Sequence, residues 1–155
     1  MNNTLKDILI GVLLGDAHIR KTGLDKAFIS FEQSSKKFEY INFLHNLIKE
    51  GGLLLTKDNL KEYSRKDLRF QNINKSLYFR TQSLKELKFL ADLFLNEKGK
   101  KIIPCNIADH LSLRSLAFWI MDDGQQVKRG GVTLCTDNYN KNEIKFLSEA
   151  LKKKF

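Results

Sequence analysis

Two aspartates, Asp16 and Asp123, each end a run of apolar residues with helical spacing, within residues 9–16 and residues 116–124. A carboxylate at the C-terminal end of an apolar helix is unfavourable, because it faces the negative end of the helix dipole and lies beside buried surface. If the two helices pack in parallel, the carboxylates meet, and two charges about 5 Å apart repel by roughly 3 kcal/mol at an effective dielectric of about 20. A divalent metal ion would turn this repulsion into attraction. The pair therefore predicts a metal site, although either aspartate alone is typical of a solvated helix end.

The segments that follow the two aspartates also match each other. Each aspartate leads through a polar stretch to strand-like residues, 27–31 and 132–136, and then to a helical stretch, 38–44 and 142–147. This pattern is a weak internal repeat of a helix, two strands and a helix. It predicts two related halves, residues 1–104 and residues 105–155, which meet next to the single proline, Pro104.

With these features the chain resembles the LAGLIDADG homing endonucleases, in particular the single-chain, intron-encoded type with two motifs. Gly11, Gly15 and Asp16 occupy the third, seventh and eighth letters of the first motif. Residues 116–124 resemble the second motif, with Asp123 as its eighth letter. Lys101 matches a basic residue that the family has near its active site. The resemblance covers nearly the whole chain.

The resemblance implies an α+β class and the LAGLIDADG homing-endonuclease fold. In this fold a pseudo-twofold αββαββα repeat pairs the two motif helices and places antiparallel sheets in the major groove of DNA. It implies Asp16 and Asp123 as metal ligands and catalytic residues, Lys101 as a third catalytic residue, and magnesium (Mg2+) as the cofactor. The implied function is site-specific hydrolysis of phosphodiester bonds in double-stranded DNA, as in intron homing.

The two motif helices must pack closely to bring the acids together. Gly11 and Gly15 lie four residues apart on one helix face, where they would let another backbone approach. The corresponding positions of the second motif hold Phe118 and Asp122. Close packing is therefore supported from the first helix only.

The composition favours a polyanionic partner, because 27 lysines and arginines outnumber 18 acids and give a net charge of +9. Residues 77–82 alternate between apolar and polar like a strand, and arginine and glutamine on a strand suit base edges. The alternative is an ordinary solvated sheet face. The predicted DNA-binding residues are Arg20, Gln33, Arg65, Arg69, Arg80 and Gln82.

Far fewer residues follow the second motif than the first. Compared with the family, the second half lacks further strands, a last helix and a counterpart of Lys101, so we expect the second repeat to be incomplete. The chain is then a truncated reading frame, a degenerate remnant, or a fragment completed by another chain or by self-association. Two other functions remain open: non-catalytic DNA binding, and binding of intron RNA as a maturase.

The remaining signals concern location and other chemistries. Apolar runs are too short to cross a membrane and no signal peptide opens the chain. We therefore expect an intracellular protein without a membrane partner, in an organelle such as the mitochondrion or in bacterial or phage cytoplasm. The isolated Cys105 and Cys135 argue against a disulfide framework or a zinc site and are predicted to be small core residues.

Overall fold

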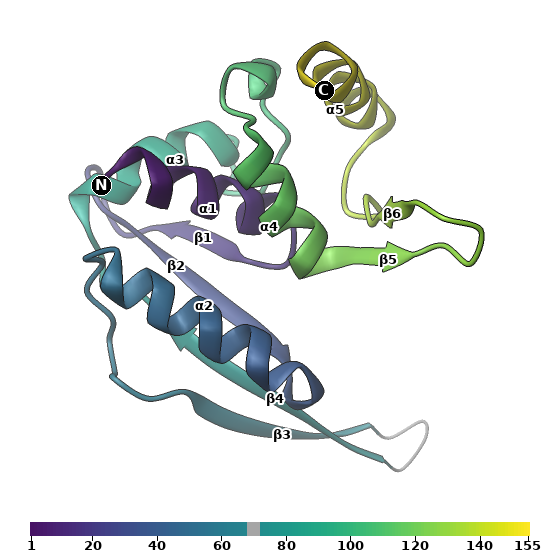
Figure 1. Cartoon of the computed structure of the whole chain (residues 1–155). Helices are drawn as coiled ribbons and strands as arrows, with labels where there is room; N and C mark the ends of the chain where they lie inside the picture. The colour runs from purple at the N-terminus through teal and green to yellow at the C-terminus, as the bar shows by residue number, and fades with distance from the viewer. Residues whose placement is uncertain (68–71) are drawn as a thin grey trace.

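The computed structural model describes residues 1–67 and 72–155, and its elements follow the order of the predicted repeat (Figure 1). The first repeat comprises α1 (Asn3–Leu14), β1 (His18–Lys21), β2 (Ala27–Ser34), α2 (Phe38–Glu50), β3 (Lys61–Asp67), β4 (Asn72–Arg80) and α3 (Lys88–Phe94). The second comprises α4 (Leu113–Asp123), β5 (Gly124–Gln126), β6 (Val132–Leu134) and α5 (Lys141–Lys154). Short 3-10 turns are η1 (Ser35–Lys37), η2 (Lys85–Leu87) and η3 (Ile107–Asp109). The predicted α+β class and the repeat are confirmed, while the boundary at residue 104 stays a prediction.

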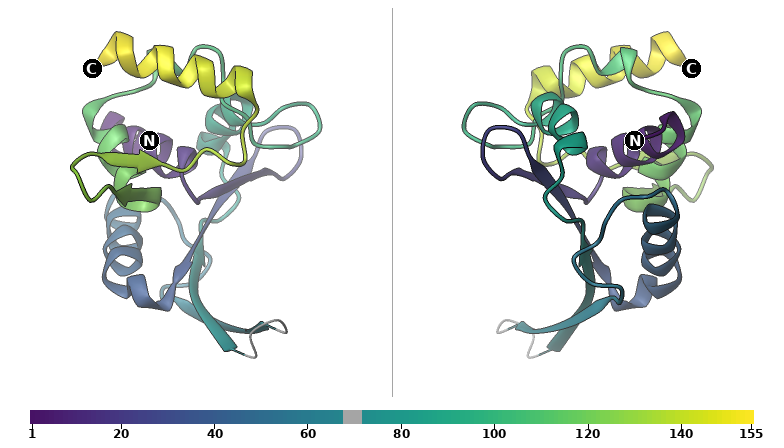
Figure 2. Two further views of the ribbon diagram at one scale, coloured as in Figure 1. Left: turned by 90° about the vertical axis from the view of Figure 1, so that its right-hand side faces the viewer. Right: turned by 90° about the vertical axis from the view of Figure 1, so that its left-hand side faces the viewer.

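Each repeat has its own antiparallel sheet. The first has the strand order β1-β2-β4-β3, with Phe31 of β2 opposite Phe79 of β4. The second consists of β5 and β6, with Gly124 opposite Leu134. The β3–β4 hairpin extends well away from the helices (Figure 2). The described part of the second repeat therefore presents a much smaller sheet than the first.

The first sheet has one apolar face and one polar face. Along β2 the side chains alternate, so that Ala27, Ile29 and Phe31 are buried and the residues between them are partly exposed. Phe31 stacks on Phe79 with a ring separation of 4.4 Å. Helix α2 lies along the sheet (Figure 1) and buries an apolar stripe that includes Ile41. The other face of the sheet is left open and polar.

Helix α1 is the central helix of the molecule and lies beside α4 (Figure 1). A side-chain carbon at Gly11 would collide with the main-chain oxygen of Ser115 and with Phe118, and one at Gly15 would collide with Asp122. The close approach expected from the glycines of the first motif is confirmed. Glycine on one helix alone is enough, because each larger residue of α4 lies against a glycine of α1.

Neither predicted core cysteine lies in the core. Cys105 is exposed and Cys135 is half-buried next to β6. The prediction was wrong because both cysteines lie in connecting segments, outside the apolar faces of helices and strands. No helix in the described part of the chain has the length and the apolar character to span a membrane.

Candidate active site

Three acids meet where the motif helices end. Asp16 follows the C-cap Gly15 of α1 and is exposed, whereas Asp122 and Asp123 are the last two residues of α4. Asp123 is half-exposed, but only 3% of the surface of Asp122 is accessible. The parallel ends predicted from the sequence are thus formed, and a third, buried carboxylate lies between them.

The buried carboxylate of Asp122 joins the two helices. Its Oδ2 accepts a hydrogen bond of 2.6 Å from the main-chain N–H of Asp16, while its Oδ1 accepts from the Gln33 amide at 3.0 Å and from the Tyr40 hydroxyl at 3.1 Å. The missing side chain of Gly15 leaves the space that this carboxylate fills. Asp122 therefore fixes the position of Asp16 relative to α4.

Gln33 bridges two of the acids. Its Nε2 donates to Asp16 Oδ2 at 2.9 Å as well as to Asp122 Oδ1, and the side chain is 7% exposed. We predicted Gln33 as a DNA-binding residue, and that role stays a prediction. The alternation of β2 explains why its side chain reaches the acids, since Gln33 is in phase with the buried Ile29 and Phe31. The same alternation, followed to the end of the strand, would have placed Gln33 among the acids.

Burial and mutual repulsion disfavour the charged forms of the acids. Burial, together with the charge of Asp16, raises the pKa of Asp122 to about 6 despite the three donors around it. Burial and Asp16 also raise the pKa of Asp123, against the opposing effects of Lys37 and Lys101. These shifts are the expected signature of carboxylates held close together at the edge of a core. A cation at this place would relieve the repulsion.

Lys101 lies beside the end of α1. Its Nζ donates to the main-chain oxygens of Gly15 at 2.7 Å and Ala17 at 3.0 Å. Burial lowers its pKa, while the three nearby acids oppose that shift. A cation is favourable at the carbonyl end of a helix, and here it also bonds the residues on either side of Asp16.

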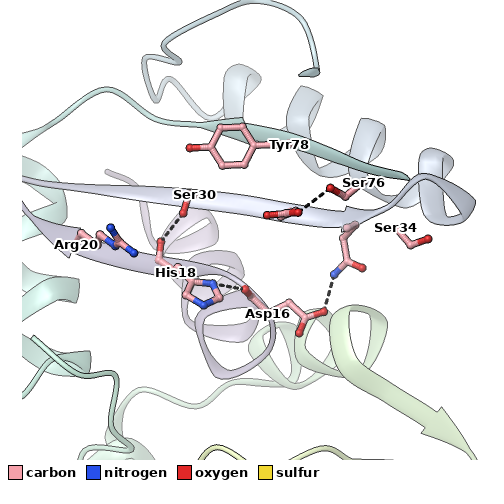
Figure 3. Close-up of a pocket in the computed structure, with 9 residues that line it drawn as sticks. Asp16, His18, Arg20, Ser30, Ser34, Ser76 and Tyr78 are labelled. Carbon is pink, nitrogen blue, oxygen red and sulfur yellow. Dashed lines mark hydrogen bonds between the residues drawn. The ribbon is translucent and has the colours of Figure 1, made fainter. Parts of the chain in front are cut away.

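A polar hollow of about 530 Å³ leads from Asp16 across the open face of the first sheet. In Figure 3, His18 and Arg20 follow Asp16 along one side, with Ser30, Ser76 and Tyr78 on the neighbouring strands. The ring Nδ1 of His18 lies 2.8 Å from the main-chain oxygen of Asp16. The hollow therefore joins the acids to a face rich in hydrogen-bonding groups.

The other predicted DNA-binding residues do not share one location in the structure. Arg20 lines the hollow, and Arg80 is exposed with its guanidinium 5.0 Å from the ring centre of Phe28. Arg65 is exposed and forms an ion pair of 3.2 Å with Glu32. The side-chain amide of Gln82 donates to the main-chain oxygen of Leu55 at 3.2 Å. Arg69 lies outside the described residues.

Comparison with known proteins agrees with this geometry. Residues 6–155 match the LAGLIDADG DNA endonuclease family. The chain belongs to this family.

Among its relatives, a cytochrome b mRNA maturase bI2 of Debaryomyces hansenii is 32% identical over 158 residues, covering 100% of this chain and 58% of the relative. A probable intron-encoded endonuclease 1 of Wickerhamomyces canadensis is 30% identical, covering 97% of this chain and 65% of the relative. The structure of the homing endonuclease I-WcaI bound to its DNA recognition sequence matches with a TM-score of 0.86 at 26% identity, over 99% of this chain and 68% of that one. The chain thus spans about three fifths of the length of these curated relatives.

The family assignment explains why α1 and α4 carry matching letters. Gly15 and Asp122 are the seventh letters of their LAGLIDADG motifs, and Asp16 and Asp123 are the eighth letters. The structure brings the two seventh letters into contact and leaves both eighth letters accessible. The accessible acids are therefore the pair that can reach a ligand, and the buried acid supports them.

The accessible acids fit a divalent cation of the kind that LAGLIDADG endonucleases generally need. In the part of the chain that the structure describes, no three His, Cys, Asp or Glu side chains form a closed metal cage. Mg2+ rarely uses such a cage, because it keeps several waters and binds one or two carboxylates together with substrate phosphates. Asp16 and Asp123 would hold the ion, while Asp122 is committed to its three donors.

Changing Gln33 to glutamate should destabilise the protein by about 2 kcal/mol at neutral pH. The substitution keeps the shape but replaces the donor between two carboxylates with a third acid. The loss should shrink as pH falls, because the new carboxyl has a raised pKa in the folded state and is neutral once it binds a proton. Urea unfolding measures it, with the exposed Gln126→Glu as the control. Equal stability of the two variants at neutral pH would contradict the bridging role.

Proposed function

We propose that this chain acts as a site-specific endonuclease that hydrolyses phosphodiester bonds of double-stranded DNA with a divalent metal ion, Mg2+ in particular. The observation that supports it is the convergence of Asp16 and Asp123 at the paired ends of α1 and α4, beside the polar face of a four-stranded sheet. A net charge of +9 favours the DNA polyanion.

The metal ion would activate a water molecule and stabilise the departing oxygen of the phosphodiester. Asp16 and Asp123 would hold the ion, and the ammonium group of Lys101 would neutralise charge on the phosphate. Gln33 and Asp122 would position Asp16 through the hydrogen bonds that they make with its carboxylate and its main-chain N–H. Arg20, Arg65 and Arg80 would bind the duplex along the open face.

Cleavage of a randomised duplex-DNA library tests this proposal directly. The purified chain is incubated with Mg2+ or with chelator, and the cut ends are sequenced. We expect Mg2+-dependent cuts at a long, partly palindromic site. Binding that falls with salt, without cuts in any divalent metal, would instead show a non-catalytic DNA-binding protein.

A second candidate function is the binding of intron RNA. Relatives from Debaryomyces hansenii and Saccharomyces cerevisiae carry the name cytochrome b mRNA maturase bI2. Competition between structured intron RNA and duplex DNA would distinguish the two functions. Tighter binding of RNA would favour the maturase. A completing chain, self-association and an organellar or bacterial location stay predictions, of which mass measurement in solution tests the first two.

A further inference from the structure

The loop of residues 95–101, which follows α3, is closed and held in a defined shape. Leu95 and Lys101 pair across its base as an antiparallel bridge. Within the loop, Asn96 Oδ1 accepts hydrogen bonds from the main-chain N–H groups of Lys98 at 3.0 Å and Lys100 at 2.9 Å. The loop is therefore fixed by its own hydrogen bonds, while the side chains of both lysines are exposed.

This 95–101 loop lies against the first sheet at β1. It forms one wall of a hollow of about 570 Å³, and Arg20 and Lys21 of β1 line the other side. Arg20 also lines the hollow that leads from Asp16 across the open face of the sheet. The two hollows therefore meet at Arg20, and together they connect the acids with the 95–101 loop.

The cations around this second hollow differ in whether an acid neutralises them. Lys21 forms an ion pair of 2.7 Å with Asp92 of α3, which fastens β1 to that helix. Arg20, Lys98 and Lys100 are exposed, and none of them forms an ion pair with an acid that the structure describes. These three positive charges are thus available to an anion.

The position of the three cations suits the phosphate backbone of a duplex. Four strands about 4.8 Å apart span about 14 Å, and the major groove of DNA is about 12 Å wide, so a sheet in the groove brings its edges to the backbones. Strand β1 is an edge strand, because the order is β1-β2-β4-β3. Glu97 also lines the hollow, but the three cations outnumber it. The edge therefore favours phosphates over base edges.

From this geometry we infer that Lys98 and Lys100 of the loop, together with Arg20, clamp the phosphate backbone of duplex DNA at the β1 edge. The inference rests on the proposed function and extends the DNA contact beyond the open face of the sheet. Lys101 anchors the base of the loop to the end of α1. The clamp is thereby held in a fixed position relative to Asp16, so a phosphate bound there sets the register of the duplex over the acids.

The salt dependence of DNA binding tests the inference. A duplex selected from the randomised library by binding is titrated in chelator at several salt concentrations. Each lost phosphate contact lowers the slope of log affinity against log salt by about 0.9. The double variant Lys98→Gln, Lys100→Gln should therefore lose about 10-fold less affinity than the wild type between about 50 and 200 mM salt.

A matched control removes the same charge elsewhere. Lys152→Gln, Lys153→Gln changes two exposed lysines of α5, which packs on η3, and should keep the wild-type slope. Both double variants should melt at the wild-type temperature, since all four lysines are exposed. A wild-type slope in the loop variant, or an equal fall in slope in the control, would overturn the inference and leave the proposed function intact.

Mapping of the phosphates locates the contact. Single phosphates are neutralised by ethylation, and the loop variant should lose sensitivity at adjacent phosphates of one strand. Losses scattered over both strands would contradict a clamp. Where the wild type cuts the duplex, the loop variant should cut at the wild-type rate at saturating protein, and a lower maximal rate with an unchanged salt slope would also contradict it. Failure of the wild type to bind any duplex would reject the proposed function, and the clamp with it.

Discussion

Replacing Asp16 with asparagine should reduce the rate of DNA cleavage by about 10³-fold or more while leaving DNA binding intact. Asparagine keeps the size of the side chain and can still accept the hydrogen bond from Gln33. It removes the negative charge that holds a divalent cation. Because Asp16 is exposed, the fold should tolerate the change. Cleavage is measured in Mg2+, and binding is measured by electrophoretic mobility shift in Ca2+ or chelator.

Asp123→Asn should have the same effect, because the two eighth-letter acids act as a pair. Asp58→Asn provides the matched control. Asp58 is an exposed acid on the loop after α2, where it forms an ion pair with Lys49. We expect it to cleave at the wild-type rate. Retained cleavage by either active-site variant would disprove the assigned role of that acid.

Replacing Gly11 with alanine should destabilise the protein by about 3 kcal/mol. In an isolated helix the same change would stabilise by about 1 kcal/mol, because alanine is the better helix former. Here the added methyl group would meet the main-chain oxygen of Ser115, which no side-chain rotation can move aside. The helices must separate, and the contacts that the large side chains of α4 make with α1 are lost with them. The sign of the change therefore reports on the packing of the two motif helices.

Chemical denaturation followed by circular dichroism measures this loss. Thr4→Ala on the exposed start of the same helix is the control, with an expected change within about 0.5 kcal/mol. A Gly11→Ala variant as stable as the wild type would show that α1 and α4 do not approach as closely in solution. Cleavage by the variant should fall as well, because Asp16 and Asp123 are positioned by the two helices that separate.

Much of this fold could be predicted from the sequence because the signals are local. Apolar periodicity locates the helices, alternation locates the strands, and the paired glycines of the first motif identify the helix contact. The roles of Asp16, Asp123 and Lys101 stay predictions. The structure nevertheless places all three together at the ends of α1 and α4, in the arrangement that the motif implies.

The parts that were missed depend on side-chain direction and on contacts between distant segments. Gln33 has the residue type of a base-contacting side chain, but its phase in β2 turns it toward the acids. Asp122 occupies a motif position that suits a small residue, but Gly15 on the facing helix leaves room for its side chain. Lys37 belongs to no recognised motif, and its hydrogen bond to the main-chain oxygen of Asp122 joins residues 85 positions apart.

The unequal helix seam also restricts which surfaces can recognise each other. Phe118 and Asp122 act as protrusions that fill the recesses at Gly11 and Gly15. Two copies of α1 facing each other would leave these recesses empty, while two copies of α4 would oppose phenylalanine to phenylalanine and acid to acid. The seam is therefore asymmetric in shape: the first repeat contributes the glycines, and the second contributes the larger side chains that fill the space beside them.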